Sequence, residues 1–193
     1  MQLLETIKVD QGHAYFIPFH NARFNKTRSV LFNIKEPLNL ADFIRPPDLG
    51  YYRCRIVYSK QIEKVEFIPY QQRSFKTFQI VYNDDINYDF KYLDRRSIQK
   101  LEQFKKNADD ILIVKQGFIT DTSIANVAFF DHEKWITPTN PLLKGTTRAR
   151  LLAEHKIIEQ PISVSQLKTF SKMALMNALV DFMVLEEFIL IGG

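Results

Sequence analysis

The sequence is poor in the residues that build disulfide bonds and metal sites. It contains one cysteine and four histidines among 193 residues, and the histidines lie far apart, at positions 13, 20, 132 and 155. A single cysteine cannot form an internal disulfide, and such scattered histidines make no metal-ligand pattern. Cys54 lies within the strand-like run YYRCRIVYS, so we expect a buried, unreactive thiol and no metal site.

Long apolar runs and a strong charge of one sign are also missing. The longest apolar stretches, such as MALMNALV at 173–180, are far too short to span a bilayer, and Glu5 and Lys8 interrupt the N-terminus before any signal-like core. The 26 basic residues against 22 acidic ones are a mild excess spread along the chain, which does not imply nucleic-acid binding. We therefore expect a cytoplasmic globular protein with neither a membrane nor a nucleic acid as partner.

What is present is a mixture of strand and helix patterns in two unlike halves. Residues 1–83 are predicted to form an α+β subdomain. LLETIKVD and AYFIPF, around QGH, predict a hairpin, and HNARFNKTRSVLFNI (20–34) has helical spacing. Three further runs, YYRCRIVYS, KVEFIPY and FKTFQIVYN, predict an antiparallel meander that completes this subdomain. NDDINYD (83–89) is the expected linker.

Residues 84–193 are predicted to form a second, α/β subdomain. Helices are expected over 93–108 and, directly after Gly145, over 146–157. Short strands punctuated by turn residues are expected between 110 and 138, and two strand-like runs, KMALMNAL and FMVLEEFILI, end the chain.

The stretch NYDFKYLDRR, residues 87–96, places Lys91 between two aromatic residues at what reads as the start of a helix. A solvated lysine whose stem packs on nearby apolar surface would be a sufficient explanation. Alternatively, Phe90 and Tyr92 remove water from the amine and keep part of it neutral, which makes it a nucleophile able to form a Schiff base. The stretch alone leaves both interpretations open.

Two other stretches carry polar groups at suggestive places. In LLKGTTRARLL (142–152), Gly145 is followed by Thr146 and Thr147 at an expected helix N-terminus, which favours either simple capping or an anion site. In GFITDTSIANVAFF (117–130), Asp121 ends a short strand ahead of a polar turn. An isolated aspartate there is usually a turn former.

Taken in order, FHNAR, FKYLDR, GFITDTSIANVAFF, WITPTNPLLKGTTRARLL and MNAL resemble the class IV (fold type IV) pyridoxal-phosphate aminotransferases over nearly the whole chain. The resemblance implies a two-subdomain fold of mixed α/β (α+β) class, with pyridoxal 5'-phosphate in a cleft between the subdomains, and a homodimer. The chain lacks the segment that precedes LLETIKV in other members and their C-terminal helix, so substrate contacts made by those parts cannot be carried over.

The resemblance also implies roles for individual residues. Lys91 matches the catalytic lysine that forms a Schiff base with the cofactor, and Arg23 matches the arginine that binds its phosphate. Thr146 and Thr147 match the phosphate-binding turn. Asp121 stands where the family usually has a glutamate paired with the pyridine nitrogen, and a carboxylate there keeps the ring protonated and electron-accepting.

Within the family, FKYLDRR and the turn Asn177-Ala178-Leu179 look like those of 4-amino-4-deoxychorismate lyases, where this turn lies near the cofactor phosphate. The resemblance therefore implies conversion of 4-amino-4-deoxychorismate to 4-aminobenzoate and pyruvate, a step towards folate. The alternatives are a branched-chain or D-amino acid aminotransferase, and, in another class, a non-catalytic relative or basic binding module. Four arginines are candidates for the substrate carboxylates, although each also reads as a surface or ion-paired residue: Arg53, Arg55, Arg95 and Arg96.

Overall fold

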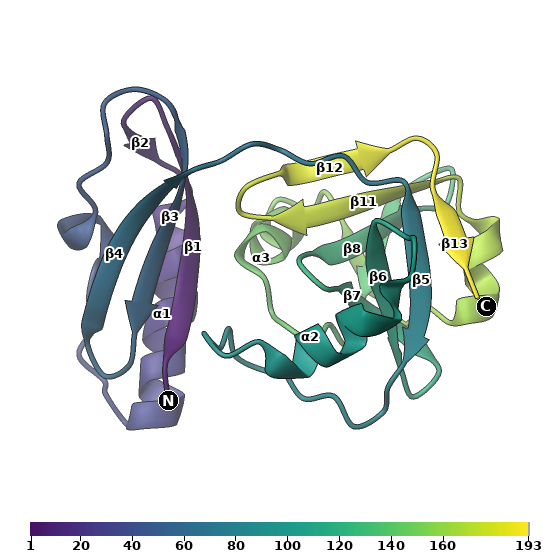
Figure 1. Cartoon of the computed structure of the whole chain (residues 1–193), viewed down its shortest axis with the longest axis horizontal. Helices are drawn as coiled ribbons and strands as arrows, with labels where there is room; N and C mark the ends of the chain where they lie inside the picture. The colour runs from purple at the N-terminus through teal and green to yellow at the C-terminus, as the bar shows by residue number, and fades with distance from the viewer. Residues whose placement is uncertain (193) are drawn as a thin grey trace. The chain divides into compact units, whose positions relative to one another are not determined.

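The structure is a computed structural model that describes residues 1–192 (Figure 1). Its contacts divide the chain into two compact units. The first comprises Met1–Gln72 and Phe90–Asp94, and the second comprises Arg73–Asp89 and the chain from Arg95 onwards. This division differs from the predicted boundary between 83 and 84, because residues 73–83 pack with the second unit and residues 90–94 return to the first.

The first unit is a four-stranded antiparallel sheet with one long helix. The strand order is β2-β1-β3-β4, and in Figure 1 the helix α1 runs along this sheet. Its elements are β1 (Leu3–Asp10), β2 (His13–Ala14), α1 (Ile17–Phe32), the short helix η1 (Leu40–Phe43), β3 (Tyr51–Tyr58) and β4 (Ile62–Pro69). The predicted hairpin is confirmed, since β1 pairs with β2 around a turn in which Gln11 and Gly12 have φ of 47° and 77°, a type I′ geometry that glycine favours.

Helix α1 begins three residues earlier than predicted. The run AYFIPF was assigned to a strand, but only Ala14 of it lies in β2, and the helix starts at Ile17. Pro18 stands in the first turn, where its fixed φ suits a helix and its missing N–H is not needed. At the other end, Asn33 takes a left-handed conformation with φ of 55° and its N–H bonds the Ser29 carbonyl, which ends the helix.

The core of the first unit follows the alternation of β1. Leu3, Ile7 and Val9 face inward and are fully buried, with Phe24 of α1 and Tyr58 of β3 packing edge-to-face against each other at 4.6 Å between ring centroids. Cys54 is buried in the same core, as predicted, and burial raises the pKa of its thiol to about 12.

The second unit is built on a larger mixed sheet. The strands follow the order β10-β9-β8-β7-β6-β5-β13, and β11 pairs with both β8 and β12. The strands are β5 (Thr77–Tyr82), β6 (Asp110–Lys115), β7 (Phe118–Thr122), β8 (Asn126–Phe130), β9 (Trp135–Pro138), β10 (Ile158–Gln160), β11 (Lys172–Asn177), β12 (Asp181–Leu185) and β13 (Ile189–Ile191). The helical elements are α2 (Arg96–Glu102), η2 (Gln103–Lys105), α3 (Thr146–Ala153) and η3 (Val164–Thr169).

The predicted three-stranded meander is wrong in its third member. The run FKTFQIVYN forms β5, which pairs in parallel with β6 and β13 of the second unit. Four consecutive residues of β5, Phe78–Val81, are buried, and burial on both faces is typical of a parallel strand inside a covered sheet.

Two further predicted elements are shorter than expected. Helix α2 covers only the middle of the predicted span 93–108. The last run divides into β12 and β13 because Glu186 and Glu187 between them remain exposed, where they form ion pairs with Lys172 and Lys76.

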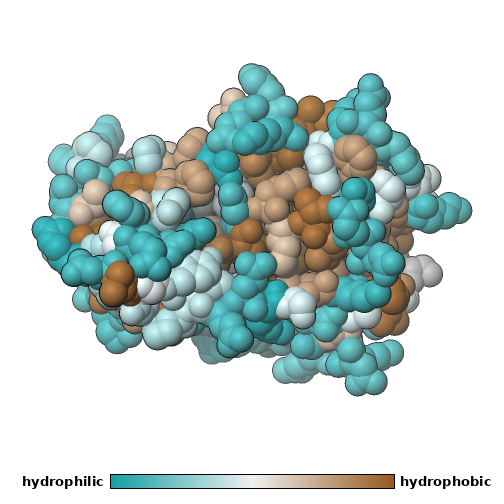
Figure 2. All heavy atoms as spheres, turned by 90° about the horizontal axis from the view of Figure 1, so that it is seen from above, coloured by the Kyte–Doolittle hydropathy of each residue, from teal (hydrophilic) through white to brown (hydrophobic). Residues whose placement is uncertain are grey.

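The surface of the second unit carries a band of apolar side chains bordered by hydrophilic ones on the side of β12, visible in Figure 2. Val184 of β12 contributes to the exposed apolar surface. Of the helices within residues 1–192, none combines the length and the apolar character that crossing a bilayer requires.

Candidate active site

The predicted site residues fall into two groups, one in each unit. Arg23 and Lys91 lie in the first unit. Asp121, Thr146, Thr147, Asn177 and Ala178 lie in the second.

Lys91 lies in an irregular segment beside β1, in a tight turn closed by the bond from the Tyr92 amide to the Phe90 carbonyl at 2.9 Å, and not at the start of a helix, since α2 begins at Arg96. The Lys91 carbonyl accepts a hydrogen bond from the Leu4 amide at 2.9 Å, and Tyr92 forms a β-bridge with Leu3. The expectation that Lys91 belongs to the second unit is therefore wrong: backbone pairing with β1 attaches it to the first.

Arg23 projects from α1 onto Glu5, a carboxylate in the middle of β1. Arg23 Nε donates to Glu5 Oε1 at 2.8 Å, and Nη2 donates to Oε2 at 2.6 Å. The Glu5 side chain is completely buried. Burial favours its protonated form, but the charge of Arg23 and hydrogen bonds from His20 and Arg23 outweigh burial and lower the Glu5 pKa from 4.5 to about 2.

His20, also on α1, completes this buried cluster. Its Nδ1 lies 2.7 Å from Glu5 Oε2. Burial lowers the His20 pKa; Glu5 opposes this shift, whereas the positive charges of Arg23 and Lys91 add to it.

In the second unit, Asp121 lies at the end of β7 and is buried, with 4% of its surface exposed. Its Oδ1 accepts from Asn126 Nδ2 at 2.7 Å and its Oδ2 from the Leu143 amide at 2.9 Å. Burial raises the Asp121 pKa from 3.8 to about 6, although these bonds and the charge of Arg148 oppose the shift. Asp121 is thus a carboxyl group that exchanges its proton near neutral pH.

The N-terminus of α3 lies next to the Asp121–Asn126 pair. Asn126 Nδ2 also donates to the Leu143 carbonyl at 2.8 Å, and a Cβ atom at Gly145 would lie only 1.9 Å from Asn126 Oδ1. Position 145 therefore requires glycine because a side chain there would collide with Asn126. The backbone conformation does not require it, since the φ of −70° is ordinary. Thr146 and Thr147 follow as buried first residues of the helix, where N–H groups have no intrahelical partner and favour anions.

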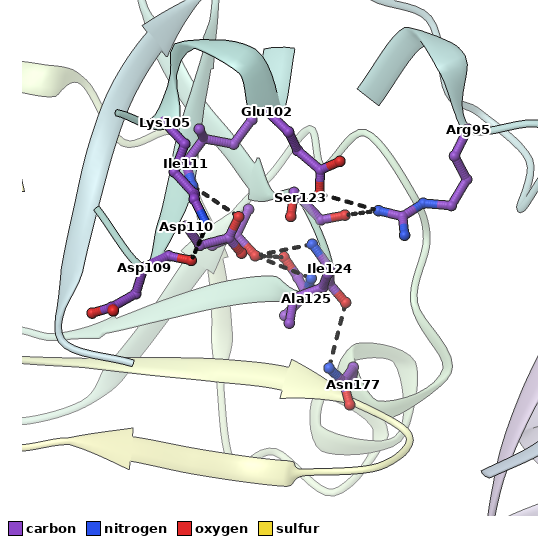
Figure 3. A network of polar contacts seen from close by, with 11 residues as sticks. Arg95, Glu102, Lys105, Asp109, Asp110, Ile111, Ser123, Ile124, Ala125 and Asn177 are labelled. Atoms are coloured by element: carbon purple, nitrogen blue, oxygen red, sulfur yellow. Dashed lines mark hydrogen bonds and ion pairs between the residues drawn. The ribbon is translucent and has the colours of Figure 1, made fainter. Parts of the chain in front are cut away.

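The turn between β11 and β12 lies near the loop of residues 122–125, which follows Asp121. Asn177 Oδ1 accepts from the amides of Leu179 and Val180 at 2.9 and 3.0 Å, which closes the turn that contains Ala178. Asn177 Nδ2 donates to the Ile124 carbonyl at 3.4 Å. Figure 3 shows this contact linking the turn to the loop that follows Asp121.

That loop, residues 122–125, is held by two further sets of contacts (Figure 3). Arg95 Nη2 donates to the Ser123 carbonyl at 2.7 Å. Thr122 Oγ1 accepts from the Ile124 and Ala125 amides at 3.3 and 3.1 Å. These hydrogen bonds hold the loop that follows Asp121 in place, which suits a group that must keep one orientation.

Comparison with known proteins identifies this arrangement. A family model described as "Amino-transferase class IV" matches residues 86–187, which contain Lys91, Asp121, the start of α3 and the Asn177 turn. The chain belongs to the class IV aminotransferases. It is an enzyme with the mixed α/β fold of that family, as the predicted fold class stated.

Individual relatives cover almost the whole chain. An "Uncharacterized protein" of Haemophilus influenzae is 35% identical over 185 residues, which are 92% of this chain and 97% of the relative. The solved structure of a "putative 4-amino-4-deoxychorismate lyase" from Haemophilus somnus is 37% identical, with a TM-score of 0.86, covering 92% of this chain and 96% of that one. A hypothetical aminotransferase from Mycobacterium tuberculosis, solved in a PLP-bound form, shares the fold at 15% identity and a TM-score of 0.76, covering 97% and 81% of the two chains.

Class IV members solved with PLP imply pyridoxal 5'-phosphate as the cofactor of the family, and the residues present fit such a group. A phosphate requires cations, hydroxyls and free amides: the first unit offers the Arg23 guanidinium, and the second, taken by itself, offers the amides and threonine hydroxyls at the glycine-dependent start of α3. A protonated pyridine nitrogen requires a carboxylate partner held in one orientation, and the buried Asp121 carboxyl, bonded by Asn126 and the Leu143 amide, is a group of that kind. Within residues 1–192, no group of three or more His, Cys, Asp or Glu side chains is arranged to hold a metal ion.

Sequence reasoning missed Glu5 and His20. Glu5 occupies an inward position in the alternation Leu3, Glu5, Ile7, Val9, where a carboxylate requires a buried partner. The signal for Glu5 in the sequence was a charged residue at an inward position of a strand whose other inward positions are apolar.

Proposed function

We propose that this class IV enzyme is a pyridoxal-phosphate-dependent lyase that converts 4-amino-4-deoxychorismate to 4-aminobenzoate and pyruvate. The observation that carries the proposal is the 37% identity, over 92% of the chain, with the Haemophilus somnus structure named for this activity. The Asn177-Ala178-Leu179 turn, which resembles that of the lyases, is consistent with it. The product would serve folate synthesis, and a cytoplasmic location is part of the same proposal.

Each residue has a proposed task. Lys91 bonds the cofactor through its amine and later removes a proton from the substrate. Arg23, Thr146 and Thr147 bind the cofactor phosphate, together with the turn of Asn177 and Ala178. Asp121 pairs with the ring nitrogen. When bound, the cofactor supplies an electron-accepting ring, which makes the substrate carbon next to the nitrogen acidic.

The reaction is an elimination that needs no oxidant or reductant. The Lys91 amine takes the proton from the ring carbon that bears the nitrogen. The bond from the neighbouring ring carbon to the enolpyruvyl oxygen breaks, and the leaving enolpyruvate gains a proton and becomes pyruvate. The remaining ring is aromatic 4-aminobenzoate, so aromatisation drives the step.

For the substrate carboxylates, four arginines were candidates, and the structure shows different surroundings for each. Arg55 forms an ion pair with Glu66 at 3.1 Å, and Arg95 binds the Ser123 carbonyl. Arg53 on β3 is half-buried and its Nε lacks a hydrogen-bond partner among the described residues. Arg96 begins α2 and is exposed.

The decisive test has two parts. Purified enzyme should be yellow, and reduction with borohydride should attach the cofactor permanently to Lys91, as peptide mapping by mass spectrometry would reveal. Incubation with 4-amino-4-deoxychorismate should release 4-aminobenzoate and pyruvate in equal amounts. An adduct on another lysine would refute the role of Lys91, and a colourless protein that takes up no cofactor would favour a non-catalytic relative or binding module.

An aminotransferase acting on branched-chain or D-amino acids is the second candidate, favoured by the name of the matching family. It would use the same lysine to move a proton from the amino acid to the cofactor carbon. Amino-group transfer from an amino acid to a 2-oxo acid, with no 4-aminobenzoate formed from aminodeoxychorismate, would establish this activity instead.

A further inference from the structure

Glu5 is a charged side chain at the centre of the core of the first unit. It stands between Leu3 and Ile7 on the inward face of β1, and none of its surface is exposed. Both of its oxygens accept hydrogen bonds from Arg23, and Oε2 also contacts His20. Its low pKa shows that this cluster holds it as an anion at neutral pH.

Stability alone does not explain such a group. Removing two charges from water costs several kcal/mol each, so a buried ion pair is often no better for stability than apolar residues of similar volume. Position 5 lies in a strand whose inward neighbours are apolar. An apolar side chain at position 5 would fill the core as well, so core packing does not account for the ion pair.

The geometry of the pair indicates its purpose. Glu5 engages Arg23 side-on, through Nε and Nη2, at 2.8 and 2.6 Å. Two parallel bonds fix the plane of a guanidinium, which a single contact would leave free to turn. Nη1 takes no part in either bond, but it lies in the guanidinium plane that the two bonds fix. Glu5 therefore sets the direction in which Nη1 points.

We propose that Glu5 is a positioning residue: it holds the Arg23 guanidinium in the orientation that binds the cofactor phosphate. This inference rests on the proposed cofactor role of Arg23. It assigns to β1 a function in the site, alongside its backbone pairing with the segment that carries Lys91.

Glu5→Gln tests the proposal because the amide keeps the shape of the side chain but not its two acceptors. Both oxygens of Glu5 accept from Arg23, so the amide nitrogen of Gln must face an Arg23 N–H in one of the two places. Two donors cannot bond each other, and the guanidinium must release one contact and turn.

The measurement compares the affinities for pyridoxal 5'-phosphate and for pyridoxal, which lacks the phosphate. Glu5→Gln should weaken pyridoxal 5'-phosphate binding by roughly ten-fold or more and leave pyridoxal binding nearly unchanged. In an Arg23→Met background, the same Glu5 substitution should change neither affinity, because its effect passes through Arg23. Glu66→Gln is the matched control, since Glu66 also pairs with an arginine, Arg55, on the sheet of the same unit, and it should leave both affinities unchanged.

Several outcomes would overturn the inference. Equal losses for the two ligands would mean general loosening of the unit, and a gain for pyridoxal 5'-phosphate would mean that Glu5 only offsets the charge of Arg23. If Glu5→Gln does not fold, Glu5→Asp, which retains the carboxylate on a shorter stem, should fold and show a smaller loss of phosphate preference. Failure of both variants to fold would assign Glu5 to the fold alone. If the wild-type protein binds neither ligand, the proposed function itself fails.

Discussion

At the scale of single residues, Asp121 shows how burial and hydrogen bonding compete. Two good donors, from Asn126 and the Leu143 amide, stabilise its anion, yet loss of solvation is larger and raises its pKa to about 6. A carboxyl group in this range carries a proton during part of the time at neutral pH. In its ionised form such a group can pair with a protonated pyridine nitrogen, and burial strengthens that pair because water does not compete for it.

This shift predicts a pH-dependent stability of the cofactor-free protein. The unfolded Asp121 ionises near 3.8 and the folded one near 6, so between these values the folded state binds more protons. The free energy of unfolding therefore falls as pH rises from about 4 to about 6, by roughly 3 kcal/mol from this group. In the Asp121→Asn variant, the free energy of unfolding should fall less between pH 4 and pH 6, which urea unfolding at a series of pH values would measure.

Asp131→Asn provides the control, because Asp131 is only half-buried and its pKa is lowered by backbone hydrogen bonds from Lys134 and Glu133. Its removal should not reduce the fall in stability between pH 4 and 6. Parallel stability curves for the wild type and Asp121→Asn would show that burial does not shift this carboxyl group.

At the scale of elements, the start of α3 depends on one close contact between a glycine and a strand residue. Gly145 lets the helix begin against the Asn126 amide, which in turn binds Asp121. Strands β7 and β8 and helix α3 thus meet at Asp121 of β7, Asn126 of β8 and Gly145, which directly precedes α3. The N-terminus of α3, with the buried residues Thr146 and Thr147, therefore lies close to the Asp121 carboxyl group.

Gly145→Ala should therefore disturb both stability and cofactor binding. The added Cβ would lie 1.9 Å from Asn126 Oδ1, so α3 or Asn126 must move, at a cost of about 1–3 kcal/mol. The affinity for pyridoxal 5'-phosphate, measured by absorbance titration, should fall as well.

Gly117→Ala is the matched control for this prediction. Gly117 has a φ of +79° in the β6–β7 turn, and a Cβ there would meet nothing within 4 Å. Alanine should cost about 1–2 kcal/mol through backbone strain and leave cofactor affinity intact. Equal affinities for wild type and Gly145→Ala would remove the start of α3 from the proposed phosphate site.

At the scale of the whole molecule, the surface of the second unit suggests association. Apolar side chains gather beside β12 (Figure 2), and Val184 and Ile189 are 38% and 48% exposed. Exposed apolar patches often mark interfaces, and the family resemblance implies a homodimer.

We therefore expect a homodimer of the 22.7 kDa chain in analytical ultracentrifugation at micromolar concentration. Val184→Lys, which places a charge on the exposed apolar surface of β12, should shift the equilibrium towards the monomer. A wild-type protein that sediments as a monomer at all concentrations would contradict the proposal, and an unaffected dimer in the variant would place the interface elsewhere.

The sequence by itself determined the local chemistry. Alternation in LLETIKVD, the turn at Gln11-Gly12, the buried Cys54 and the ordered motifs of the family could all be read from neighbouring residues, since strand and turn formation depend on short-range periodicity and backbone conformation. The same is true of the helix after Gly145.

Only the tertiary structure decided which segments pair and which groups are buried together. Backbone pairing with β1 attached Lys91 to the first unit, and parallel pairing with β6 placed β5 in the second. The Glu5–His20–Arg23 cluster and the raised pKa of Asp121 also arise from partners distant in sequence. Strand partners and desolvation are long-range properties, so no local pattern in the chain specifies them.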